Sequence, residues 1–173
     1  TVEAPGDVEL GMRFGLWMSE QASVTLAAVV SLPLGETSDN SGVWTGDDEY
    51  NQHFTLGYER RLPVLPLSLG VSAGFNNRNR GYADEIHLAA IVGLTGFGPM
   101  GARFVVHAVE PLDNGRKDFH GGDFGFATNR QRFLLYGSEV NIEIFEGFGI
   151  AFGAYGLARM ENVPSAVTLR GSV

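Results

Sequence analysis

Strict alternation between apolar and small or polar residues is the feature that most constrains the fold of this chain. Over residues 8–18, apolar side chains such as Leu10 alternate with small or charged ones such as Gly11. Residues 24–32 repeat the pattern after the short connection 19–21. Successive side chains of a β-strand point to opposite faces, so each segment has one apolar face and one small or polar face. The opening stretch therefore predicts an antiparallel hairpin.

Further alternating segments follow in pairs, which predicts an all-β, up-and-down antiparallel arrangement. The paired segments are residues 50–59 with 67–76, 85–95 with 100–109, and 134–144 with 148–154. We expect residues 165–173 to add one more strand, so that eight to nine strands are visible. The connections between segments are alternately short and long, as in a transmembrane β-barrel with tight turns at one rim and longer loops at the other.

The composition excludes several classes of protein. A chain of 173 residues predicts a single domain, residues 1–173, and 24 glycines favour strands and turns over helices. The absence of cysteine excludes disulfides and thiolate metal sites, and a net charge of -8 argues against a nucleic-acid partner. No run of about 18 apolar residues could span a bilayer as a helix. Lys117 is the only lysine, which is unusual for a soluble β-protein.

The alternation alone does not say which face meets water, and a soluble barrel of the lipocalin type is the main alternative. With the apolar face inward, large side chains would crowd an eight-stranded interior. The outer surface would then consist of Gly, Ala, Ser and Thr with almost no lysine, which is a poor soluble surface. The reverse orientation removes both difficulties. We therefore expect the apolar face to meet lipid and the polar face to line the interior of a barrel.

Three details support a barrel that crosses a membrane. The segments are about ten or eleven residues long, as a tilted spanning strand requires. Aromatic residues lie near both ends of the segments and would form two girdles. A closed barrel is needed because an open sheet edge in hydrocarbon leaves backbone groups unpaired. Because bacterial barrels usually have an even strand number, we expect either an incomplete barrel in this chain or a last segment that does not span.

Short motifs near the strand ends resemble one family. They are the Gly-Asp-Val-Glu-Leu of residues 6–10, the Leu-Pro-Leu-Gly of residues 32–35, the Asp-Glu-Tyr of residues 48–50, and residues 78–85 with their Ala-Asp-Glu. The chain resembles the outer-membrane proteins of the phenol-degradation meta pathway. The resemblance implies a barrel of roughly twelve strands, which is within the range of bacterial barrels. The resemblance further implies that this barrel admits hydrophobic or aromatic compounds. It also implies that this chain lacks the family's leading strands and its terminal aromatic residue.

Charged and imidazole side chains occur at polar positions of the alternating pattern and are the candidate interior residues. They are Glu9, Arg13, His53, Glu59, Glu85, His87, Arg103, His107, Glu139, Glu143 and Arg159. Such groups must pair or stay wet, so they either fill and rigidify the barrel or form a polar path whose charge sets selectivity. A hydrolytic site of Ser68 or Ser72 with His53 lacks a nucleophile elbow. The three histidines lack a fixed ligand spacing, so we predict no metal site. We also predict no catalytic residue and no cofactor.

These patterns predict a protein of the Gram-negative outer membrane that is not an enzyme. Its expected role is a channel or transporter for passive passage of small, hydrophobic or aromatic solutes, with the loop of residues 110–129 at its mouth. The alternative is a structural barrel with a plugged interior whose loops bind partner subunits or surface polymers. Outer-membrane lipid and lipopolysaccharide are the expected partners, and self-association into a homo-oligomer is left open.

Overall fold

The computed structural model describes residues 8–34, 49–116, 129–145, 148–161 and 168–172. The regular structure in these ranges is strand and turn. No helix among these residues is long and apolar enough to cross a membrane. The strands are β1 (Val8–Met18), β2 (Ala22–Leu32), β3 (Asn51–Leu62), β4 (Leu67–Asn77), β5 (Glu85–Phe97), β6 (Met100–Pro111), β7 (Arg132–Phe145), β8 (Phe148–Glu161) and β9 (Thr168–Ser172).

Every segment that the alternating pattern predicts as a strand contains one. Strand β8 continues to Glu161 because the pairing with β7 persists beyond the predicted end at residue 154. The long connection expected from residue 110 begins later, since Glu110 and Pro111 still pair with β5. Strands β1 to β8 have 11 to 14 residues, slightly more than a tilted spanning strand needs.

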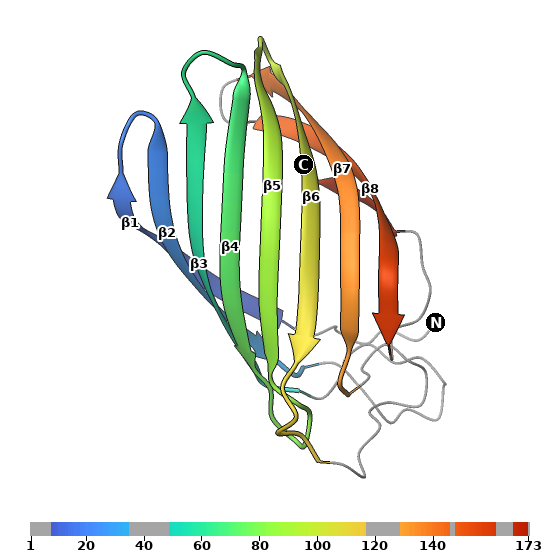
Figure 1. The fold of residues 1–173 in the computed structure, drawn as a ribbon. Coiled ribbons are helices and arrows are strands. Elements are labelled where there is room, and N and C mark those ends of the chain that lie inside the picture. The colour runs from blue at the N-terminus through green and yellow to red at the C-terminus, as the bar shows by residue number, and fades with distance from the viewer. Residues whose placement is uncertain (1–7, 35–48, 117–128, 146–147, 162–167, 173) are drawn as a thin grey trace.

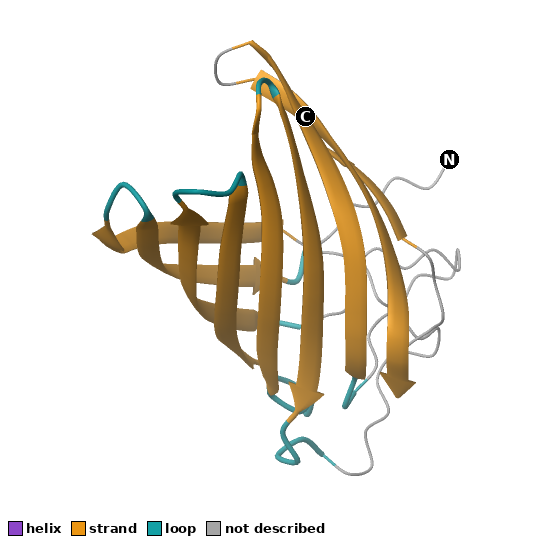
Figure 2. Cartoon of the chain, turned by 45° about the horizontal axis from the view of Figure 1, so that its top comes forward, coloured by secondary structure: helices purple, strands orange, loops and turns teal. Residues whose placement is uncertain are grey.

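The strands form one antiparallel meander. Each strand pairs with its neighbour in sequence, in the order β1 to β9, and the sheet curls strongly about its concave face (Figures 1 and 2). Strand β1 pairs with β2, β9 pairs with β8, and no pairing joins β1 to β9 in the described part of the chain. The described strands therefore form an open curved sheet, and not the closed barrel expected from the sequence.

The two ends of the sheet differ in the length of their connections. At one end, here called the short-turn end, residues 19–21, 63–66 and 98–99 join consecutive strands. At the opposite, long-loop end, the connections are residues 33–50, 78–84 and 112–131. Figure 1 shows the two sets at opposite ends of the strands. The expected alternation of short and long connections is thus present.

The two faces of the sheet differ in polarity and in exposure. On one face large apolar side chains are exposed, including Val71 at 58%, Leu88 at 51% and Phe152 at 58%. On the other face several polar side chains are covered, with Ser68 only 6%, Glu85 only 5% and Glu139 only 9% exposed, whereas Arg103 near the short-turn end is exposed. In a single curved layer, side chains splay apart on the convex face and shield one another on the concave face. The apolar face is therefore convex and the polar face concave.

A β-bulge in β1 changes the faces of two residues near the short-turn end. Gly15 pairs with Thr25 whereas Trp17 pairs with Val24, so Leu16 is an extra residue in β1. Strict alternation places Trp17 on the polar face and Met18 on the apolar face. The bulge reverses both positions, and Trp17 shares the convex face and is 52% exposed.

A second irregularity in β8 moves Arg159. Leu135 pairs with Leu157, but Leu134 pairs with Arg159, so one residue of β8 is unmatched between them. Arg159 was expected among the interior residues. The register instead places it beside Leu134 on the convex face, near the long-loop end, where its Nη2 lies 3.2 Å from Glu161 Oε1.

Candidate functional site on the concave face

Ten of the eleven charged and imidazole residues expected in an interior share the concave face. Residues directly opposite each other on neighbouring strands share a face, so the register assigns each of them. The ten, without Arg159, are Glu9, Arg13, His53, Glu59, Glu85, His87, Arg103, His107, Glu139 and Glu143. They fall into two groups toward opposite ends of the strands, and a pair on β1. No hydrogen bond or ion pair joins Glu9 to Arg13 in the described structure.

Three histidines form a row across the concave face. The ring centroids of His53 and His87 lie 4.6 Å apart, although β4 separates their strands. The centroids of His87 and His107 lie 5.3 Å apart, and His107 meets the edge of Phe133 at 6.0 Å. His87 Nδ1 lies 3.2 Å from His107 Nε2, within hydrogen-bond distance. The curvature of the sheet thus brings together imidazoles that the sequence spreads over three strands.

Glu85 connects the histidine row to the long-loop end. Its Oε2 lies 3.2 Å from His87 Nε2 and accepts a hydrogen bond of 3.4 Å from Asn76 Nδ2. Its other oxygen, Oε1, accepts a hydrogen bond of 2.5 Å from Arg78 Nη1. The two ring nitrogens of His87 thus have different partners, Glu85 at Nε2 and His107 at Nδ1. These contacts form a continuous chain from His107 through His87 to Glu85.

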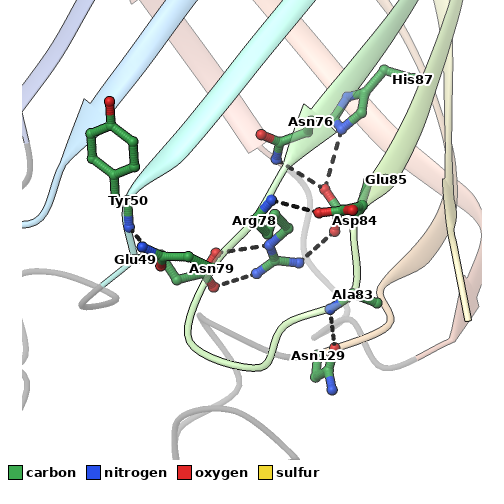
Figure 3. A network of polar contacts seen from close by, with 10 residues as sticks. All are labelled: Glu49, Tyr50, Asn76, Arg78, Asn79, Ala83, Asp84, Glu85, His87 and Asn129. Atoms are coloured by element: carbon green, nitrogen blue, oxygen red, sulfur yellow. Dashed lines mark hydrogen bonds and ion pairs between the residues drawn. The ribbon is translucent and has the colours of Figure 1, made fainter. Parts of the chain in front are cut away.

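Arg78 is the centre of a buried ion cluster at the long-loop end (Figure 3). Its Nε donates to Glu49 Oε2 at 2.8 Å, its Nη2 pairs with Glu49 Oε1, and its guanidinium lies 4.4 Å from the centre of the Tyr82 ring. The Arg78 and Glu49 side chains are 7% and 0% exposed. Burial alone would lower the pKa of Arg78, but the hydrogen bonds and negative charges of Glu49 and Glu85 outweigh it and raise that pKa. Arg78 is therefore a permanent cation between two carboxylates.

The connection 78–84 is tied to the connections on both sides of it. On the β3 side, the Tyr50 amide donates to Asn79 Oδ1 at 3.0 Å. On the β7 side, the amide of the fully buried Ala83 donates to Asn129 Oδ1 at 2.8 Å. Asp84 accepts from Asn114 at 2.6 Å. Hydrogen bonds therefore join the β4–β5 connection to the connection before β3 and to the connection between β6 and β7 (Figure 3).

Toward the short-turn end the concave face has a hollow of about 510 Å³. Small residues of β4 and β5, including Ser68 and Gly93, line its floor. Arg103 at its margin forms an ion pair with Glu139, directly opposite on β7. The charged side chains around the hollow are Glu59, Arg61, Arg103 and Glu143. This group is separate from the histidine row and is the second candidate site.

The geometry offers little to the hydrolytic and metal hypotheses. His53 lies 3.2 Å from Thr55 Oγ1, and no hydrogen bond joins it to Ser68 or Ser72 among the described residues. Ser72 is opposite Gly57, whereas His53 is opposite Asn76, four residues away along each strand. Within the described ranges, no group of three or more His, Asp or Glu residues is placed to hold a metal ion.

Sequence reasoning missed Glu49 and Arg78, which form the most deeply buried ion pair in the described structure. Both lie just outside strands, where charged residues are normally solvated. The available signal was their position, because Glu49 precedes β3 and Arg78 follows β4 at the same end of neighbouring antiparallel strands. Opposite charges at such positions are close enough to pair.

Comparison with known proteins adds no relative. No family model matches the chain, and no curated protein is significantly similar to it.

Proposed function

We propose that the chain forms part of the wall of a β-barrel in the outer membrane of a Gram-negative bacterium and lets small solutes pass. The observation that carries this proposal is the convex face, where large apolar side chains are exposed on all of β1 and β3 to β8. Soluble monomers rarely expose contiguous apolar patches larger than a few hundred Å². Lipid is the solvent that such a face fits.

The aromatic residues at the short-turn end support the same environment. Phe145 and Phe148 stack on either side of the β7–β8 turn with ring centroids 4.8 Å apart. Trp17, turned outward by the bulge, and Tyr58 are also exposed near this end. Amphipathic aromatic rings favour the boundary between hydrocarbon and headgroups. These side chains would form one girdle of the proposed barrel.

The open edges require a partner in a membrane. Unpaired N–H and C=O groups in hydrocarbon cost several kcal/mol each, and β1 has one paired edge among the described strands. We infer a closed barrel in which further strands join the β1 edge to the β9 edge. A barrel of roughly twelve strands, as the family resemblance implies, would have a wider interior than eight strands allow.

The concave face would then line the passage. Its ionic groups on β3 to β7 can stay hydrated there and repel or attract solutes according to charge. The family resemblance points to hydrophobic or aromatic solutes, while the charges on this face favour a solute that also carries a polar group.

The ion cluster around Arg78 favours a second candidate function. Glu49, Arg78 and Glu85 are almost fully covered, and the connection 78–84 is fixed to both neighbouring connections. Such a rigid mouth also suits a plugged structural barrel whose loops bind partner subunits or surface polymers such as lipopolysaccharide.

Conductance separates the two candidates. The protein would be refolded into planar lipid bilayers, and single-channel currents would be recorded across a gradient of potassium chloride. A passage gives discrete current steps whose reversal potential shifts when charges on the concave face are neutralised. An intact, heat-modifiable barrel without current steps would reject the channel and favour the plugged barrel.

A further inference from the structure

Two arginines stand at opposite ends of one row of residues that crosses the hollow at the short-turn end. In the register, Arg61 is opposite Ser68, Ser68 is opposite Gly93, and Gly93 is opposite Arg103. The four residues therefore form one row across β3 to β6 on the concave face. Neighbouring strands lie roughly 4.8 Å apart, so about 14 Å of sheet separates the two arginine backbones. Both arginines line the hollow, and Arg103 pairs through its Nε with Glu139 on β7, the strand on the side away from Arg61.

The space between the arginines is kept open by small residues. A Cβ added at Gly93 would collide with Ser68 Oγ, so a larger residue there would force the Ser68 hydroxyl to turn away. On neighbouring β4, a Cβ added at Gly70 would meet Ile91, the Tyr58 carbonyl oxygen and Glu59 at ordinary contact distances of 3.5–4.0 Å. The resulting hollow of about 510 Å³ is within the range of small-molecule sites, roughly 300–1,000 Å³.

Charges of both signs surround this space. Arg103 is paired with Glu139, but no ion pair joins Arg61, Glu59 or Glu143 to another described residue. Glu59 lies two residues from Arg61 on the same face, and Glu143 borders the hollow from β7. The lining of the hollow therefore carries two guanidinium groups, one of them paired with Glu139, and two carboxylates without an ion pair among the described residues.

We propose that the hollow binds a small zwitterionic solute that carries one carboxylate and one ammonium group. The carboxylate lies in the hollow and accepts hydrogen bonds from the guanidinium group of Arg61 and from the Nη groups of Arg103, whose Nε pairs with Glu139. The ammonium group faces Glu59 or Glu143. This inference rests on the proposed function, because it names a solute class for the same passage.

A solute of one charge fits the hollow less well. A monoanion would contact the arginines but would leave Glu59 and Glu143 facing its apolar end. A monocation would pair with these carboxylates but would be repelled by Arg61 and Arg103, which line the same hollow. Discrimination then comes from repulsion as well as attraction.

Direct binding tests the proposal without requiring conductance. The whole protein in phosphatidylcholine nanodiscs would be titrated with L-alanine, propionate and isopropylamine, which are similar in size, and saturation-transfer NMR would follow the ligands. We expect saturable binding of alanine and about tenfold weaker binding of the other two, as expected for loss of a charge-assisted hydrogen bond. Arg61→Gln should abolish the preference for alanine over isopropylamine, and Glu143→Gln should reduce the preference over propionate.

Matched controls lie on β1. Arg13→Gln and Glu9→Gln make the same charge changes on the same face, but these residues do not line the hollow. Equal binding of the three probes, or equal effects of Arg61→Gln and Arg13→Gln in variants that keep the wild-type heat-modifiable gel migration, would overturn the inference. Conductance without alanine binding would reject this inference alone. Alanine binding without conductance would reject the proposed passage and leave the binding site standing.

Discussion

Gly74 of β4 lies directly beneath the imidazole of His53 of β3. A Cβ added at Gly74 would be 2.7 Å from His53 Nε2 and 3.0 Å from the carbonyl oxygen of Phe54. The missing side chain lets His53 lean across β4 and reach His87 on β5, where the ring centroids are 4.6 Å apart. The histidine row therefore depends on a glycine in the strand between its first two members.

We predict that Gly74→Ala destabilises the protein by about 1–3 kcal/mol, the usual cost of overpacking a filled site. The added methyl group must displace either His53 or the β3 backbone. Urea unfolding of the refolded protein in detergent micelles would measure the change. Gly70→Ala is the matched control, because its nearest neighbour, Ile91 Cβ, would lie at an ordinary 3.5 Å. Equal losses at the two glycines would show that crowding beneath His53 is not the cause.

We predict that Arg78→Met lowers the free energy of unfolding by more than Gly74→Ala does. The substitution removes the bidentate Arg78 guanidinium from the carboxylate of Glu49, which is fully buried. Removing one member of a buried ion pair typically costs about 3–5 kcal/mol. The free energy of unfolding would be compared with that of the double variant Glu49→Gln/Arg78→Met, which should recover part of the loss.

Arg132→Met is the control for this prediction. Arg132 pairs with Glu110 and Glu161, but all three side chains are partly exposed, so water can replace the lost contacts. We therefore expect Arg132→Met to leave the free energy of unfolding almost unchanged. A loss at Arg132 as large as the loss at Arg78 would show that burial does not set the strength of the Arg78 cluster.

The strands and their faces could be predicted because the alternation is local and repeated. A residue such as Leu88 is assigned to a face by its neighbours two positions away, whatever the rest of the chain does. The meeting of His53 with His87 could not be predicted in this way. It depends on the curvature of the sheet and on Gly74, and neither follows from the spacing of the histidines.

The two irregularities show a second limit of the pattern. Leu16 and Met18 are both apolar, so strict alternation runs through the bulge without any visible break. At the other end of the chain, the shift before Arg159 falls among Leu157 and Ala158, which suit either face. A bulge changes the faces of the residues beyond it without changing their composition, so pairing alone reveals it. Whether β1 and β9 pair with each other is likewise a matter of strand pairing, which the alternating pattern does not predict.

We predict that a lysine introduced at two neighbouring positions of β4 affects folding into lipid in opposite ways. Val71 is 58% exposed on the convex face, and Ser72 is on the concave face. A lysine in the lipid-facing middle of a spanning strand costs about 2–4 kcal/mol. Val71→Lys should therefore impair folding into lipid vesicles, measured by heat-modifiable migration, while Ser72→Lys should fold. Equal folding of both variants would contradict a lipid-facing convex surface.

The outward position of Trp17 gives the last prediction. The chain has two tryptophans, so Trp44→Phe leaves Trp17 as the single reporter in a protein refolded into vesicles. Because Trp17 pairs with Val24 and shares the convex face, brominated phospholipids should quench its fluorescence. Strict alternation without the bulge would turn Trp17 toward the concave face, where aqueous iodide but not brominated lipid would reach it. Moving the reporter to β4, with Val71→Trp and Ser72→Trp in a background that carries both Trp17→Phe and Trp44→Phe, calibrates the two faces. If Trp17 is quenched by iodide and not by brominated lipid, as the Ser72→Trp reporter should be, the bulged register is ruled out. If Trp17 is quenched by brominated lipid, as the Val71→Trp reporter should be, both the bulge and a lipid-facing convex surface are supported.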